Sequence, residues 1–190
     1  NITVSLPDGS TRELAAGSTA LDMASSIGPR LAKAAVAAKV DGEQVDLTRP
    51  LPDGATVAII TADTPEGRHV LRHSTAHVMA QAVTRLFPGA KFSIGPAIEN
   101  GFYYDFELPD GTTFSDDDLA AIENEMREIV KADQPFTRSE HSIEDAKRLF
   151  ADQPYKVEII ERVENAAAGD SAFDATDAGE VGMVDGVATI

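Results

Sequence analysis

Histidines crowd into one short stretch of this 190-residue sequence, and their spacing allows them to act together. His69, His73 and His77, three of the four histidines, fall within nine residues. Residues four apart on a helix project from one face, so the His73 and His77 imidazoles can share a water, a phosphate or a metal ion. The alternative is two half-buried rings bonded to backbone or solvent. Ser74 stands where zinc peptidases carry glutamate, which excludes that motif.

Two further side chains have chemical potential, and each has an ordinary alternative. Tyr104 places a hydroxyl in an aromatic run, where core packing is the alternative. Lys156 follows Pro154 in an apolar stretch, where a lysine can also lay its aliphatic stem on the surface. The absence of cysteine excludes disulfides and thiolate sites, and the lack of a glycine-rich phosphate loop argues against nucleotide binding in these residues.

A long helix must position the histidines. Thr64 can cap its first turn, Pro65 suits the first helical position, and the sequence predicts that the helix runs to Phe87 before Pro88-Gly89. The elements expected after it are a strand at 91–94, an aromatic strand at 102–106, a helix capped by Ser115, a short strand at 136–141, and helices from Ser142 and from Tyr155.

Residues 1–62 have the pattern of a small module. Two alternating segments around Pro7-Asp8-Gly9 predict a hairpin, and Ser18-Thr19 can cap a short helix that ends near Gly28-Pro29. Strands are expected at 34–40, 43–47 and 55–61. A hairpin, a helix and then strands predict a β-grasp (ubiquitin-like) fold, in which one helix packs across a mixed sheet.

The whole chain is therefore expected to be α+β, with a β-grasp domain at 1–62 and a second α+β domain at 63–190. Within the second domain, residues 165–186 are rich in alanine, glycine and acids and have few large apolar side chains. Such a segment buries too little surface to offset ordering, so it is expected to be a mobile loop.

Charge is spread unevenly along the chain. The net charge is −16, and residues 110–190 hold twenty acidic and only seven basic side chains. This balance disfavours a nucleic-acid-binding face there, whereas residues 1–109 are nearly neutral and leave room for a local basic patch. No apolar run approaches the length of a membrane span, and no signal-peptide pattern is visible, so a soluble cytoplasmic protein without a membrane partner is expected.

Several stretches carry a resemblance to known families. Residues 2–61 resemble a TGS domain, the ubiquitin-like module at the N-terminus of threonyl-tRNA synthetases. The stretches that match it are Leu6-Pro7-Asp8-Gly9-Ser10, Ile27-Gly28-Pro29 and Leu31-Ala32-Lys33-Ala34. The following block resembles the editing domain of bacterial threonyl-tRNA synthetases through Arg72-His73-Ser74-Thr75-Ala76-His77, Ile94-Gly95-Pro96, Asn100-Gly101-Phe102-Tyr103-Tyr104-Asp105 and Tyr155-Lys156-Val157. The resemblance runs continuously over about residues 1–163.

This resemblance implies an editing site that hydrolyses seryl-tRNA(Thr), with the 3′ end and acceptor arm of tRNA(Thr) as partner. The implied catalytic residues are His73, His77 and Lys156. The implied substrate-binding residues are Arg72, Tyr104 and Asp105. No metal or other cofactor is expected in these residues.

The parent family joins threonine to tRNA(Thr) in a core that uses ATP, Mg²⁺ and zinc, and it is a homodimer through that core. That core and the Cys-x-x-x-His segment that completes the family's editing pocket have no counterpart here. An N-terminal fragment with a truncated editing domain is therefore expected. The alternative is a non-enzymatic module that docks RNA or protein, since TGS domains also occur outside synthetases.

Overall fold

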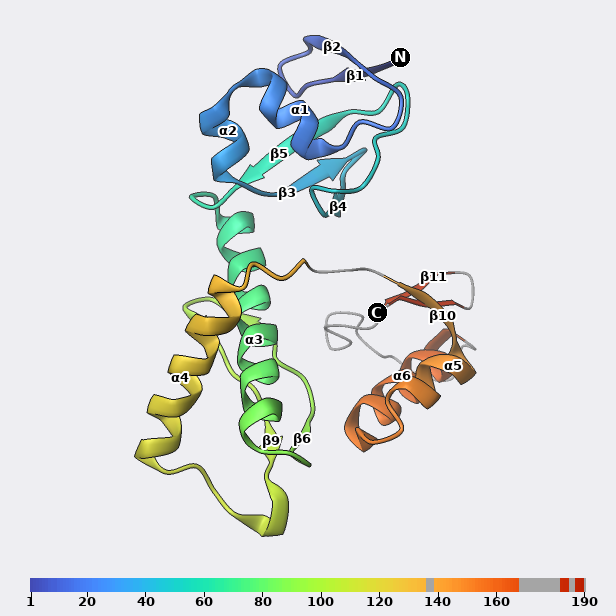
Figure 1. Cartoon of the computed structure of the whole chain (residues 1–190). Coiled ribbons are helices and arrows are strands. Elements are labelled where there is room, and N and C mark those ends of the chain that lie inside the picture. Colours follow the sequence, from blue (N-terminus) through green and yellow to red (C-terminus); the bar gives the residue numbers. More distant parts are fainter. Residues whose placement is uncertain (136–138, 168–181, 185–186, 190) are drawn as a thin grey trace. The chain divides into compact units, whose positions relative to one another are not determined.

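The computed structural model describes residues 1–135, 139–167, 182–184 and 187–189. The chain divides into two compact units, Asn1–Arg72 and His73–Ile190 (Figure 1). The division falls inside helix α3 (Pro65–Leu86), so the first two turns of this helix belong to the first unit. Within the described residues, no helix has both the length and the apolar character needed to cross a membrane.

Hydrogen bonds and a close backbone approach hold the start of α3 against the end of β5. The Thr64 hydroxyl donates to the Thr61 carbonyl at 2.9 Å and accepts the Gly67 N–H at 3.0 Å. A Cβ on Gly67 would lie 2.0 Å from the Thr61 carbonyl oxygen, so only glycine fits this approach. Lys39 Nζ lies 3.5 Å from Glu66 Oε1 and adds a surface ion pair. These contacts explain why the unit extends past the last strand.

The first unit has the predicted order of hairpin, helix and strands. Its elements are β1 (Ile2–Ser5), β2 (Thr11–Leu14), α1 (Ala20–Ile27), α2 (Pro29–Ala34), β3 (Ala35–Val40), β4 (Glu43–Val45) and β5 (Val57–Thr61). Strand β3 lies between β4 and β5, antiparallel to both. A parallel bridge from Ser5 to Thr56 connects the hairpin to the start of β5. The β-grasp prediction is therefore confirmed.

Helix α1 packs on the sheet of the first unit, and the interface is the unit's apolar core. Ala20 and Met23 face inward from α1, and Val4 and Val57 meet them from the strands; none of these four side chains is exposed. Thr19 and Asp22 form the capping box that begins α1. The core and the cap together fix α1 across the sheet. Figure 1 shows this helix in blue next to the strands.

One helix of the first unit was not predicted. Gly28-Pro29 was interpreted only as the end of α1, but Pro29 is also the first residue of α2. The physical reason is that proline lacks the N–H that is unsatisfied at a helix start, so it both ends one helix and begins the next.

The second unit contains most of α3 and the remaining elements. These are β6 (Lys91–Phe92), β7 (Ala97–Ile98), β8 (Gly101–Phe102), β9 (Phe106–Glu107), a 3₁₀ turn (Pro109–Gly111), α4 (Asp116–Lys131), β10 (Glu140–Ser142), α5 (Ile143–Leu149), α6 (Pro154–Ala167), β11 (Gly182–Val184) and β12 (Val187–Thr189). Strand β12 lies between β10 and β11, and the short pairs β6–β9 and β7–β8 are antiparallel.

Two apolar clusters stabilise the second unit. Helices α3 and α4 lie side by side and bury Val83 against Ile122 and Ile129, with Arg85 Nη1 bonded to Glu125 Oε1 at 2.9 Å (Figure 1). Helices α5 and α6 form the second cluster, in which Ala146 and Ile160 are fully buried and Ile94 packs against them. Ser115 begins α4 as predicted, through a capping box with Asp118.

Three expectations for the second unit need correction. The aromatic strand expected at 102–106 is interrupted: β8 ends at Phe102, β9 begins at Phe106, and Tyr103 is 51% exposed between them. The strand expected at 136–141 covers Glu140–Ser142, and residues 136–138 lie outside the described ones. The expected loop at 165–186 lies largely outside the described residues, but α6 extends to Ala167 and β11 covers Gly182–Val184. Alanine favours helix at the first end, and pairing with β12 forms the strand at the other.

Candidate active site

His73 and His77 form a bonded pair on α3. Their Nε2 atoms lie 3.1 Å apart, and the rings meet edge to face with centroids 4.7 Å apart. Both side chains are half-buried. One Nε2 carries the hydrogen and the other accepts it, because a neutral imidazole has one donor and one acceptor nitrogen. The predicted pair therefore exists as an interacting unit, one helical turn apart.

The neighbours of the pair on α3 differ in accessibility. His69, one turn earlier, is exposed. Arg72 is half-buried, and the division of the chain into units falls immediately after it. The role of Arg72 in binding substrate stays a prediction.

Lys156 joins the pair from helix α6, far away in the sequence. Pro154 begins this helix, and the Gln153 carbonyl accepts the Lys156 N–H at 3.0 Å, which places Lys156 in the first turn. The side chain is only 2% exposed, and Nζ lies 5.3 Å from the centroid of the Phe92 ring. Burial lowers the pKa of Lys156 from 10.5 to about 8. The alternative of an ordinary surface lysine is wrong.

His77 is electrostatically coupled to the other two residues. Burial first, and then electrostatic interaction with His73 and with Lys156, lower the pKa of His77 from 6.5 to about 4. His77 is consequently neutral at pH 7, where it offers one donor and one acceptor.

Tyr104 lies in the aromatic group that adjoins Lys156. Its ring stacks on Phe106 with centroids 5.0 Å apart and meets Phe92 at 6.1 Å. The side chain is half-buried, and burial raises the pKa of the phenol above its usual value of 10. The hydroxyl is therefore neutral at pH 7 and can donate a hydrogen bond. Core packing and a polar contact are both open to this residue.

Gly95 lies against Tyr104 so closely that no side chain fits. A Cβ at this position would lie 2.2 Å from the Cδ2 and Cε2 atoms of the ring. From the residue types, Gly95-Pro96 predicts only a break after a strand. The resemblance of Ile94-Gly95-Pro96 to a stretch of the editing domain is the sequence signal that favours a packing role for this glycine.

The contact of Asp105 with the strand opposite is made by its backbone. Its carbonyl accepts the Ser93 N–H at 3.1 Å, which continues the pairing of β6 with β9, and its side chain is exposed. This contact fixes the chain on the C-terminal side of Tyr104. The predicted role of the Asp105 carboxylate in binding substrate stays a prediction.

Comparison of the sequence with known proteins shows what this chain is similar to. Residues 2–61 match the TGS domain family. The threonine–tRNA ligase of Rubrobacter xylanophilus is 50% identical over 161 residues. Those of Citrifermentans bemidjiense and Geobacter sp. (strain M21) are 55% and 54% identical over 162 residues. These matches cover 84–85% of this chain.

The chain carries a TGS domain and is similar to threonine–tRNA ligases over most of its length. It spans about a quarter of the length of the relatives that it matches, 25% in each of the three. The predicted recognition and the α+β fold with a TGS domain are thereby confirmed. The activity, substrates and partners of the whole ligases come to this chain as proposals.

Among the residues that the structure describes, the candidate site has few groups that could bind a metal ion. No group of three or more His, Cys, Asp or Glu side chains gathers there, and His73 and His77 supply two imidazoles. A catalytic zinc site in proteins uses three protein ligands. The expectation that no metal binds at this pair stays a prediction.

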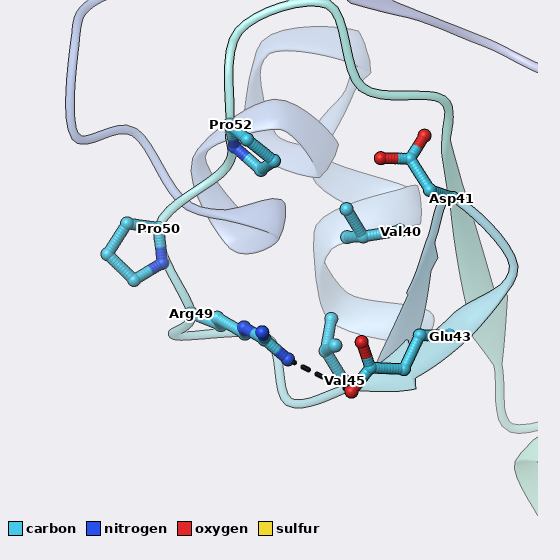
Figure 2. Close-up of a pocket in the computed structure, with 7 residues that line it drawn as sticks. All are labelled: Val40, Asp41, Glu43, Val45, Arg49, Pro50 and Pro52. Carbon is cyan, nitrogen blue, oxygen red and sulfur yellow. Dashed lines mark hydrogen bonds and ion pairs between the residues drawn. The ribbon is translucent and has the colours of Figure 1, made fainter. Parts of the chain in front are cut away.

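A separate hollow of about 240 Å³ lies in the TGS unit. Figure 2 shows its lining of Val40, Asp41, Glu43, Val45, Arg49, Pro50 and Pro52. Arg49 Nη1 lies 3.3 Å from Glu43 Oε1, so the two opposite charges at the rim offset each other. The hollow contains none of the predicted site residues.

Proposed function

We propose that this chain is the N-terminal proofreading region of a threonine–tRNA ligase. Its substrate is seryl-tRNA(Thr), the product formed when serine replaces threonine. Serine lacks one methyl group, and a binding pocket discriminates one such group by only about 1–3 kcal/mol. A second site that hydrolyses the wrong ester is the general solution to this difficulty. The identity of this chain with the ligases supports that assignment.

The observation that carries the proposal is the coupling of the His73–His77 pair to the buried Lys156. In ester hydrolysis, water attacks the carbonyl carbon, and the bond from that carbon to the ribose oxygen breaks. The reaction needs a group that orients the water, a path for its proton, and a donor for the developing oxyanion. Two imidazoles and an ammonium supply these three functions.

Each residue then has a distinct role. His73 orients the water or the terminal ribose, and the neutral His77 lies beside it as its hydrogen-bond partner. The Lys156 ammonium lies near the developing negative charge, where burial strengthens its effect. Tyr104 offers its neutral hydroxyl to the substrate. Water contributes its oxygen to serine, and the proton passes to the ribose oxygen that leaves.

The partner of this reaction is the 3′ end and acceptor arm of tRNA(Thr). The ligase reaction itself, with ATP, and the dimer of the parent family lie outside what these residues carry. The TGS unit is compatible with docking on the same tRNA.

The deciding experiment compares hydrolysis of seryl-tRNA(Thr) and threonyl-tRNA(Thr). It uses this chain and a full-length ligase that carries it, each as wild type, His73→Ala and His69→Ala. His69→Ala is the matched control, because His69 lies one turn away on the same helix and is exposed. We expect the full-length protein to hydrolyse the seryl ester selectively, His73→Ala to lose this activity, and His69→Ala to retain it.

A different outcome has a clear meaning. If the full-length wild type binds tRNA and hydrolyses neither ester, the histidine pair is structural and the chain is a docking module.

A further inference from the structure

Gln153 occupies an unusual position at the start of α6. It directly precedes Pro154, and its carbonyl accepts the N–H groups of Lys156 at 3.0 Å and Val157 at 3.2 Å. It therefore has the N-cap place of the helix that carries Lys156. Glutamine is outside the group of residues preferred there, whose short side chains bond back to the helix. The Gln153 side chain extends away from the helix instead.

The side chain of Gln153 bonds to the strand opposite. Its Nε2 donates to the Ala90 carbonyl at 3.1 Å, and its Oε1 accepts the Phe92 N–H at 3.2 Å. Strand β6 pairs with β9 through Lys91 and Phe92, and the side-chain amide completes the backbone bonding of Ala90 and Phe92. The side-chain amide of Gln153 thus forms the two hydrogen bonds that a neighbouring strand would form with Ala90 and Phe92.

Two exposed contacts connect the same segments. Lys91 Nζ donates to the Asp152 carbonyl at 2.6 Å, and the Tyr155 hydroxyl donates to Glu107 of β9. Gln153 is half-buried between these contacts and is three residues from Lys156. Phe92, whose N–H bonds to Gln153, is also the ring 5.3 Å from Lys156 Nζ. Gln153 therefore connects the backbone of both partners of this cation–π contact.

We propose that Gln153 is a positioning residue for Lys156. Its amide joins the first turn of α6 to β6 and so sets where the Lys156 ammonium lies relative to Phe92 and His77. The catalytic consequence rests on the proposed editing function, whereas the structural consequence does not. Gln153→Leu removes both side-chain bonds at similar size. Gln153→Asn keeps the amide but is too short to reach both backbone groups, and Gln153→Glu keeps the length and the acceptor.

The first test needs no substrate. NMR titration of lysine side chains, isotopically labelled in this chain, follows the pKa of Lys156, which is about 8 in the wild type. We expect Gln153→Leu and Gln153→Asn to move it toward 10.5, because a loosened helix start admits water to the ammonium. The matched control is Gln44→Leu, the same change at an exposed glutamine of β4. An unchanged Lys156 pKa in folded Gln153→Leu and Gln153→Asn overturns the proposal.

The second test is kinetic and uses the full-length ligase that carries this chain. We expect Gln153→Leu to lower kcat for seryl-tRNA(Thr) hydrolysis roughly 10- to 100-fold with little change in KM, as misplacement of a catalytic group does. Gln153→Glu keeps the acceptor for the Phe92 N–H but loses the donor to the Ala90 carbonyl, so it should recover only part of the rate, and Gln44→Leu should match the wild type. Equal kcat in Gln153→Leu and wild type contradicts the proposal.

The two tests separate the inference from the function on which it rests. If the wild type hydrolyses no ester but Gln153→Leu shifts the Lys156 pKa, the editing function is wrong and the positioning role stands. If the wild type edits and Gln153→Leu changes neither readout, the editing function stands and the positioning role is wrong.

Discussion

Lys156 Nζ lies 5.3 Å from the centroid of the Phe92 ring, in a position where the lysine side chain is only 2% exposed. The negative face of an aromatic ring attracts a cation, and the attraction grows when water is excluded. Burial still lowers the pKa of this lysine to about 8, so the group is mostly charged at pH 7. The burial of this charged ammonium is therefore expected to lower the free energy of unfolding of the protein.

Lys156→Met should make the protein more stable below pH 8. The folded-state pKa of about 8 lies below the unfolded value near 10.5, so the unfolded chain binds more protons between these values and wild-type stability rises with pH across that window. Below pH 8 the full penalty, on the order of 3 kcal/mol, remains. Methionine removes it, so the advantage of the variant should be largest at pH 7 and should shrink toward pH 10.5.

Urea unfolding of both proteins at pH 7 and pH 10 measures this difference. Lys131→Met is the matched control, because Lys131 is an exposed lysine whose loss should alter stability by less than about 0.5 kcal/mol. Equal stability of Lys156→Met and wild type at pH 7 would show that the lysine is not under a burial penalty.

The pH dependence of stability should also carry a contribution from His77. Its folded pKa of about 4 lies below the unfolded value of 6.5, so the unfolded chain takes up the proton first on acidification. The contribution is complete above pH 6.5 and is lost as pH falls toward 4. Between pH 7 and pH 4 the unfolding free energy of wild type should therefore decrease by roughly 2–3 kcal/mol more than that of His77→Asn.

Unfolding free energies measured between pH 7 and pH 4 test the contribution of His77. His69→Asn, an exposed histidine on the same helix, should keep the wild-type slope. A His77→Asn slope identical to that of wild type would contradict the prediction.

The rate of seryl-tRNA(Thr) hydrolysis should fall as pH rises through about 8. The Lys156 ammonium is the species that faces the developing negative charge, and it loses its proton near that pH. His77 is already neutral above about pH 4, so its ionisation does not change the hydrolysis rate near pH 7. Single-turnover rates between pH 6 and pH 9.5, corrected for uncatalysed ester hydrolysis, measure the profile. A rate that stays level to pH 9.5 means that Lys156 does not act as a cation.

Gly95→Ala should displace the Tyr104 ring. The added Cβ lies 2.2 Å from two ring atoms, and overpacking of this kind costs about 1–3 kcal/mol. The double variant Gly95→Ala/Tyr104→Ala should show strong coupling, because removal of the ring also removes the clash. Thermal unfolding of the four proteins in this cycle gives the coupling.

Gly101→Ala is the control for Gly95→Ala, since a Cβ on Gly101 meets no atom within 4 Å. Additive effects of Gly95→Ala and Tyr104→Ala would show that the contact is not tight.

Removal of metal should leave the hydrolytic rate unchanged. Two imidazoles fall short of the three protein ligands that catalytic zinc sites use. Seryl-tRNA(Thr) hydrolysis is measured before and after dialysis against a chelator, with the tRNA refolded in magnesium in both cases. A rate lost on dialysis and restored by zinc would overturn the expectation of a metal-independent site.

Local signals predicted the elements that carry the site. Thr64 and Pro65 predicted where α3 begins, and Ser115 predicted the start of α4, because capping acts over one helical turn. Predictions that needed more than local information were less accurate. Residues 102–106 have strand-forming side chains, but the packing of Tyr104 on Gly95 and Phe106 accompanies an interruption of the strand.

The sequence by itself predicted that His73 and His77 meet on one face of a helix, since a spacing of four residues suffices for contact. It also indicated the family, through motifs that span most of the chain. Only the tertiary structure decided that Lys156 is buried against Phe92 and that Gln153 bonds its helix to β6. The physical reason is range: helix caps and periodicity act within a few residues, whereas the contact between α6 and β6 depends on how every intervening element packs.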